Sequence, residues 1–313
     1  MNVKTKILGA AMGALGLCGL SSAALAGSTN PPGERAGLDL ATPLPEGVYF
    51  VDIAGVGNWR DAVKGADSNF SYNVPIVAWS TPWNILGAHV QFLVAAPELM
   101  AGENYQTVIP GVRNSFFAQA IYNPFVAGQL AWNFGNGFSA SYLAGAYIGI
   151  SNAGNFDNAF NRTTFHQQLA LAWHGGGWNA TANLMLGLVG NQQSCSAIAS
   201  YSCTNNDYFN YDLALTHTFG KWEVGMVAYG STDFGGYSAG YGTFGVYHPA
   251  YSEQSQFALG GLMGYNFGPV IMQLIVSTDV YTQNYNNKQT QGLLHVIIPI
   301  WNPEAPKAVV AKY

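Results

Sequence analysis

The stretch Phe165–Leu188, FHQQLALAWHGGGWNATANLMLGL, decides the fold, because it alternates in character on both sides of three glycines. One face of its first half is mostly apolar: Phe165, Gln167, Leu169, Leu171 and Trp173. The other face is polar or small: His166, Gln168, Ala170, Ala172 and His174. A period of two is typical of a β-strand, and a run of glycines suits a tight turn. The stretch therefore predicts a β-hairpin with one apolar face.

The same alternation recurs along the chain and predicts twelve strands. Their approximate ranges are 48–58, 69–80, 84–96, 116–133, 137–150, 163–174, 178–190, 207–218, 222–233, 254–266, 270–282 and 290–301. Short links such as 81–83 and 219–221 alternate with longer ones such as 97–115 and 191–206. This alternation is typical of an outer-membrane β-barrel, which has short periplasmic turns and long external loops. We therefore expect an all-β, antiparallel, up-and-down transmembrane barrel.

The composition favours the same fold. Charged residues make up 9% of the chain, against about 25% in an ordinary soluble domain. After residue 26 there is no run of 18 apolar residues, so the sequence offers no spanning helix there. A closed barrel is the remaining structure that pairs all its backbone groups within a membrane. Outer-membrane lipid is accordingly an expected partner.

Residues 1–26 are predicted to be a secretory signal peptide. Lys4 and Lys6 precede an apolar stretch, and Ala24-Leu25-Ala26 is a small-x-small cleavage site. The alternative is an uncleaved anchor, but the apolar stretch is shorter than the roughly 20 residues of a spanning helix. The chain has a net charge of −5, and losing both lysines makes it more negative. That balance argues against a nucleic-acid partner.

The predicted barrel occupies 48–301 and leaves two further segments. Residues 27–47 contain four prolines and are predicted to be irregular, lying in the periplasm or folding into the barrel mouth. Residues 302–313 are predicted to be a C-terminal tail, with re-entry of 308–313 into the wall as the alternative. Cys195 and Cys203 are an even pair in an exported chain, and we expect them to form a disulfide in an external loop.

Two stretches resemble a known family. Leu44-Pro45-Glu46-Gly47-Val48-Tyr49-Phe50-Val51-Asp52 and Val74-Pro75-Ile76-Val77-Ala78-Trp79 are similar to the opening hairpin of the transporter family called the MetA-pathway of phenol degradation. The resemblance extends as a pattern of hairpins over most of the chain after residue 26. It implies an outer-membrane barrel for small hydrophobic or aromatic compounds, which would be the solute partners. It brings no catalytic motif.

Five polar residues are candidates for contact with a solute in the lumen. They are His166, His174, Asp212, Glu223 and His295. A barrel interior is polar in any case, so ordinary packing explains them equally well. The functional alternative is that they form a constriction or a polar contact for the permeant. If they lie in a partly wet lumen, their replacement should change passage and leave folding nearly intact.

Enzymatic and structural functions are the rival hypotheses. Gly236-Tyr237-Ser238-Ala239-Gly240 matches the G-x-S-x-G pattern of a nucleophile elbow, but it lies in a Gly/Tyr-rich loop without a following helix. A lipid hydrolase using Ser238 and a histidine would need the two within hydrogen-bond reach. The histidines form no metal-binding motif, and we expect no metal or cofactor. The third hypothesis is a structural or adhesive barrel with a closed lumen.

Overall fold

The computed structural model describes residues 28–61, 66–106, 113–150, 163–190, 207–234, 240–241, 247–248, 253–284 and 287–303. Its wall consists of β1 (Gly47–Asp61), β2 (Ala66–Ile85), β3 (Ala88–Ala95), β4 (Glu98–Gln106), β5 (Arg113–Ile121), β6 (Phe125–Gly135), β7 (Phe138–Tyr147), β8 (Thr164–Gly175), β9 (Trp178–Val189), β10 (Tyr208–Phe219), β11 (Trp222–Asp233), β14 (Ser255–Asn266), β15 (Ile271–Gln283) and β16 (Asn287–Trp301). The short strands β12 (Gly240–Tyr241) and β13 (Tyr247–His248) pair with each other. Within these ranges no helix is long and apolar enough to cross a membrane.

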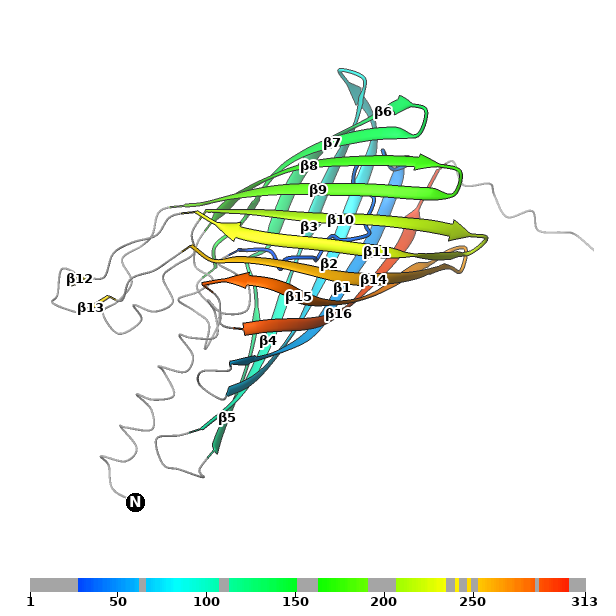
Figure 1. The fold of residues 1–313 in the computed structure, drawn as a ribbon. Helices are drawn as coiled ribbons and strands as arrows, with labels where there is room; N and C mark the ends of the chain where they lie inside the picture. The colour runs from blue at the N-terminus through cyan, green and yellow to red at the C-terminus, as the bar shows by residue number, and fades with distance from the viewer. Residues whose placement is uncertain are drawn as a thin grey trace, which may run out of the picture.

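The strands form a closed antiparallel barrel (Figure 1). Closure comes from β1, which pairs with β2 on one edge and with β16 on the other. A closed sheet has no free edge, so the backbone groups of the wall are paired between strands. The predicted fold, a twelve-stranded outer-membrane barrel, is confirmed once β3 with β4 and β5 with β6 are each counted as one wall position.

Those two wall positions are interrupted strands. β2 pairs with β3 at one end and with β4 at the other. On their other edges, β3 pairs with β6 and β4 pairs with β5. The ladder breaks at Ala96–Pro97 and at Tyr122–Pro124, where neither proline can donate a backbone hydrogen bond. The expectation of a loop over 97–115 was wrong, because β4 and β5 extend the hairpin through most of it.

The first short turn also differs from the expectation. The predicted turn at residues 81–83 is an irregularity within β2, whose register with β3 shifts between Ser80 and Asn84. The chain reverses instead at Leu86 and Gly87, which both have positive φ. The turn between β8 and β9 lies at the expected glycines, with φ of 58° at Gly176 and 84° at Gly177. Two successive positive φ values match the twist of a hairpin, and glycine adopts them without steric cost.

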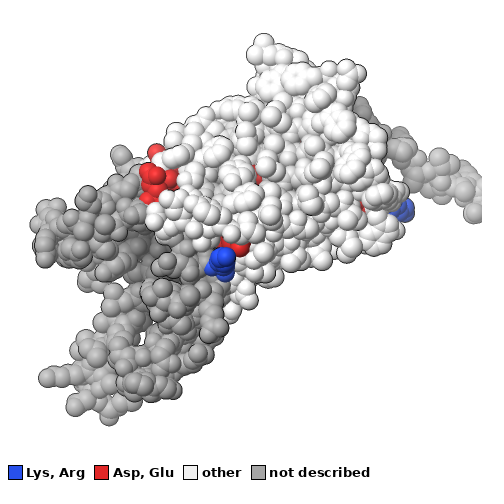
Figure 2. Space-filling view, in the orientation of Figure 1, with Lys and Arg blue, Asp and Glu red and all other residues white. Residues whose placement is uncertain are grey.

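The outer surface of the wall is apolar and almost uncharged. Figure 2 shows few charged atoms on this face of the wall: most of the Lys, Arg, Asp and Glu in view lie toward its two ends, with a small acidic spot between them. Exposed aromatic residues ring the end with the short turns: Trp83, Phe134, Phe138, Trp178, Phe219, Trp222, Phe267 and Trp301. An apolar band bordered by aromatic residues is what a membrane-embedded barrel presents to lipid.

Residues 28–46 run through the interior of the barrel, and we call this segment the plug (Figure 1, dark blue). It enters beside Thr164, at the end of the long loops. It leaves beside Ser80, near the short turns, and continues directly into β1. The first turns of the plug are held by backbone bonds such as Glu34 N–H to the Pro31 carbonyl, at 3.2 Å. Of the two placements predicted for this segment, the structure has the one inside the barrel.

Candidate functional site

Asp212 on β10 anchors the plug by its backbone. Its Oδ1 accepts the Gly33 N–H at 3.0 Å, and its Oδ2 accepts the Arg35 N–H at 2.9 Å. The carboxylate is fully buried. Hydrogen bonds to a buried charge are stronger than those between neutral groups. Asp212 therefore fixes both the position and the register of the plug.

The Arg35 side chain is a buried cation in the middle of the lumen. One terminal nitrogen donates to His166 Nε2 at 3.0 Å and to the Gln168 amide oxygen, and the other donates to the Tyr147 hydroxyl at 3.3 Å. The counter-charge is Glu34, whose Oε1 lies 3.6 Å from Arg35 Nε. Because a guanidinium can only donate, His166 Nε2 must be the acceptor. His166 is thus a partner of the plug.

Side chains of the wall also bind the plug carbonyls, which have no strand neighbour to bind them. His295 Nε2 donates to the Glu34 carbonyl at 3.1 Å, because a carbonyl oxygen can only accept. Further pairs follow the plug along its length, among them Asn210 with Asn30, Gln291 with Pro32, Asn183 with Arg35, Gln273 with Gly37, and Gln129 and Ser141 with Leu40. The polar inner face of the barrel thus substitutes for the missing β-partners.

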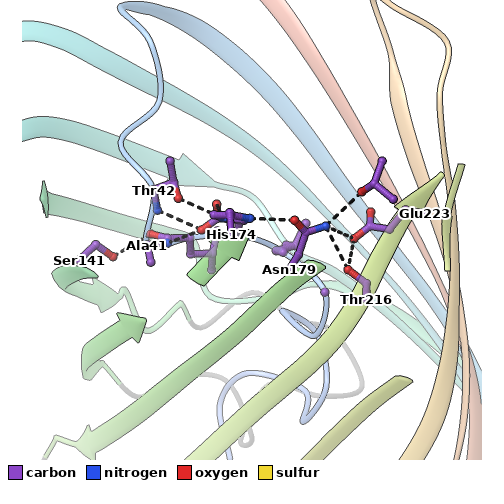
Figure 3. Close-up of polar contacts among 12 residues, drawn as sticks. Ala41, Thr42, Ser141, His174, Asn179, Thr216 and Glu223 are labelled. Carbon is purple, nitrogen blue, oxygen red and sulfur yellow. Dashed lines mark hydrogen bonds and ion pairs between the residues drawn. The ribbon is translucent and has the colours of Figure 1, made fainter. Parts of the chain in front are cut away.

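A polar network closes the end near the short turns (Figure 3). His174 on β8 lies between the Asp39 carboxylate of the plug and Asn179 Oδ1, both at 2.8 Å. Asn179 leads on to Glu223 and Thr216, which are bonded to each other at 2.5 Å. Both acceptors face the His174 ring nitrogens, so both nitrogens donate and the ring carries a positive charge. His174 and Asp39 form an ion pair that is partly exposed.

The structure places all five candidate residues on the inner face. His166, Asp212 and His295 bind the plug directly, His174 binds it through Asp39, and Glu223 accepts a 3.0 Å bond from Gln273. A role in contacting a permeant stays a prediction. The expectation of a partly wet environment was wrong for His166, Asp212 and His295, because the plug covers them and each is 0% exposed.

Sequence reasoning missed the residues that the plug itself contributes. Glu34, Arg35 and Asp39 lie in a proline-rich stretch without periodicity, and the one signal was a group of charges in a chain that has few. Several other predictions fall outside the described residues. These are the signal peptide, the Cys195–Cys203 disulfide, the Ser238 pattern and most of the C-terminal tail. Among the described residues no group of three His, Cys, Asp or Glu could hold a metal ion.

Beside the plug lies an apolar cavity of about 100 Å³. Its wall side is formed by apolar residues of β1, β2, β3, β6 and β7: Val51, Ile53, Val74, Ile76, Ala78, Leu93, Ala95, Phe125 and Leu143. Leu38, Leu40 and Leu44 of the plug face it, and Pro97 and Tyr122 at the ladder breaks line it as well. Polar and charged residues also line it: Thr29, Asn30, Glu34, Arg35, Asp39, Thr42, Gln91, Gln129 and Gln168. A mostly apolar lining with some polar groups is usual in small-molecule sites.

The cavity stays open because the plug packs against the opposite side of the lumen, on β11 and β14. A Cβ built on Gly33 would lie 2.6 Å from the Tyr229 ring, and one on Gly37 would lie 2.3 Å from Leu262 Cδ1. Both glycines have positive φ, 84° and 81°. Glycine is therefore required at both positions for conformation and for close approach to β11 and β14.

The family comparison agrees with this architecture. The family described as "Putative MetA-pathway of phenol degradation" matches residues 52–293, which is most of the barrel. The chain belongs to this family. The resemblance noted in the sequence is therefore confirmed. No curated protein matches the chain.

Solved structures resemble this member of the family in fold. The COG4313 outer membrane channel from Pseudomonas putida F1 superposes with a TM-score of 0.57 at 10% identity, covering 83% of this chain and 97% of that one. The β domain of the Bordetella autotransporter BrkA gives 0.47 at 12% identity, covering 80% and 98%. The transport unit of the Escherichia coli autotransporter AIDA-I gives 0.46 at 8%, covering 90% and 96%. The protein has the closed β-barrel fold of bacterial outer-membrane proteins.

Proposed function

We propose that this protein passes small hydrophobic or aromatic molecules across the outer membrane, binding them in the cavity beside the plug. The cavity supports this proposal, because a mostly apolar surface inside a polar lumen is a favourable binding surface for an apolar solute. It extends from Thr29 and Asn30, near the long loops, to Leu44, near the short turns. The cavity therefore runs alongside most of the plug.

The size of the cavity limits the solute. An engineered apolar cavity of about 150 Å³ is large enough to bind benzene. The cavity here is about 100 Å³, so a short alkyl chain or a single ring with a small shift of the plug is the expected occupant. The plug fills the polar remainder of the lumen, which argues against free passage of hydrophilic solutes in this state.

A tryptophan in the cavity tests the proposal. Leu93 lines the cavity from β3, and the Leu93→Trp side chain would fill much of it. Leu171→Trp is the matched control, because Leu171 is 44% exposed on the outer face. Binding of labelled toluene to protein in lipid nanodiscs, with empty nanodiscs subtracted, should fall at least tenfold for Leu93→Trp. It should be unchanged for Leu171→Trp.

Uptake completes the test. Cells that produce equal amounts of heat-modifiable, inserted protein should take up toluene faster with Leu171→Trp than with Leu93→Trp. Equal binding and equal uptake by the two variants would refute the proposal. The second candidate is a structural barrel with a closed lumen, which the many plug hydrogen bonds favour; it predicts no toluene binding by any variant.

A further inference from the structure

Two buried amide atoms at the margin of the cavity have no hydrogen-bond partner among the described residues. They are Gln168 Nε2, a donor, and Asn30 Oδ1, an acceptor. Gln168 is 1% exposed and Asn30 is 0% exposed. Both residues line the cavity. A buried polar atom left unpaired is destabilising, so a group that pairs with it is favoured there.

The two residues are neighbours. Asn30 Nδ2 of the plug points at Met185 Sδ on β9, at 3.5 Å. Met185 pairs directly across the ladder with Gln168 on β8, and side chains in such a pair lie within about 5 Å of each other at their Cβ atoms. The Asn30 carbonyl is fixed by Asn210 at 3.2 Å. Gln168 and Asn30, which carry the unpaired donor and the unpaired acceptor, thus both neighbour Met185 and both line the cavity.

We propose that Gln168 and Asn30 form a head-group subsite for a molecule with a single hydroxyl on an apolar body. This inference rests on the proposed function and names the chemical class of its solute. The hydroxyl oxygen would accept from Gln168 Nε2, and its hydrogen would be donated to Asn30 Oδ1. The apolar body would lie against the leucines and valines of the cavity.

A hydroxyl fits the unpaired atoms of Gln168 and Asn30 better than a charged group does. A hydroxyl both donates and accepts, which matches the two free positions. A carboxylate can only accept, so Asn30 Oδ1 would oppose it, and Glu34 lies beside Arg35 with a negative charge of its own. An ammonium can only donate and would leave Gln168 Nε2 unpaired.

Matched solutes test the subsite. Cyclohexanol and methylcyclohexane have nearly the same shape and differ by a hydroxyl in place of a methyl group; cyclohexanecarboxylate is the anionic comparison. Binding is measured in nanodiscs, with partition into empty nanodiscs subtracted. The wild type should bind cyclohexanol about fivefold more tightly than methylcyclohexane, the effect of one net hydrogen bond. Carboxylate should bind more weakly than either.

Three variants make the result specific. Gln168→Met and Asn30→Leu keep the side-chain size and should remove the preference for the alcohol while methylcyclohexane still binds. Gln256→Met is the control, because Gln256 is also buried with an unpaired amide but does not line the cavity. It should retain the preference.

The outcomes separate this inference from the proposed function. Equal affinity of the wild type for the alcohol and the alkane would overturn the subsite and leave the channel proposal standing. Tighter binding of the carboxylate would overturn it in favour of recognition by Arg35. Failure of all three solutes to bind the inserted wild type would overturn the proposed function itself.

Discussion

The two sides of the lumen make different contacts with the plug. The strands β8–β11 and β14–β16, which we call the plug wall, hold it with buried polar groups such as Asp212 and with close contacts at Gly33 and Gly37. The strands β1–β3, which we call the cavity wall, bind it near its end, from Ser80 to the Leu44 carbonyl and from Tyr49 to the Pro45 carbonyl, and otherwise face it across a mostly apolar cavity. The polar inner face of the plug wall therefore binds the plug, and the mostly apolar inner face of β1–β3 borders the cavity.

The largest effect is expected from Asp212→Leu on the plug wall. It removes both acceptors of the Gly33 and Arg35 amides. Each hydrogen bond to a charged group contributes roughly 1.5–3 kcal/mol, so the plug should lose most of its anchorage. We expect single-channel conductance in planar bilayers to rise by more than roughly tenfold.

Thr181→Val is its control, because Thr181 is a buried residue of β9 whose hydroxyl has no partner among the described residues. Conductance of this variant should equal that of the wild type. If Asp212→Leu also conducts like the wild type, the plug is not held chiefly by the plug wall.

A smaller effect should come from Gly37→Ala. Its Cβ would lie 2.3 Å from Leu262 Cδ1, and overpacking of this kind costs typically 1–3 kcal/mol. The plug should be pushed toward the cavity wall, so toluene binding should weaken several-fold. Gly176→Ala has a similar positive φ of 58° with nothing within 4 Å of its Cβ, so it isolates the conformational cost.

Shortening the opposing side chain sharpens this second test. The double variant Gly37→Ala/Leu262→Ala should recover much of the lost toluene binding, because it removes the overlap. Identical behaviour of Gly37→Ala and Gly176→Ala would mean that the contact with β14 does not position the plug.

The smallest effect is expected from His174→Gln. The His174–Asp39 pair is 2.8 Å long but its side chains are 35% and 28% exposed. Exposed ion pairs are typically worth up to about 1 kcal/mol, so conductance should rise by no more than about fivefold. A rise as large as that of Asp212→Leu would show that the end near the short turns, and not the buried centre, retains the plug.

The barrel was predictable because its signals are local. The alternation in Phe165–Leu188 and the glycines of its turn specify strands and a reversal without reference to any other segment. The break after Ala96 was not predictable in the same way. Pro97 was assigned to a loop, and nothing local indicates that the strand resumes beyond it to pair with β2.

The candidate site was predictable in part, from its wall residues. Period two places His166 and Asp212 on the inner face, but it does not say whether water or protein covers them. Their partners Gly33 and Arg35 lie 177 or more residues away from Asp212 in the sequence, in a segment without periodicity. Such a pairing leaves no trace in the pattern of either segment alone.

The separation in sequence also orders the assembly of the molecule. The plug precedes β1, so it is made before the strands that hold it, and its bond from His295 to Glu34 spans 261 residues. Contacts of such long range form late and slowly, because the intervening chain must first be ordered. β16 pairs with β1, which continues directly from the plug, so the pairing that closes the ring also brings His295 within reach of the plug. The position of the plug and the closure of the barrel therefore depend on the same strand, β1.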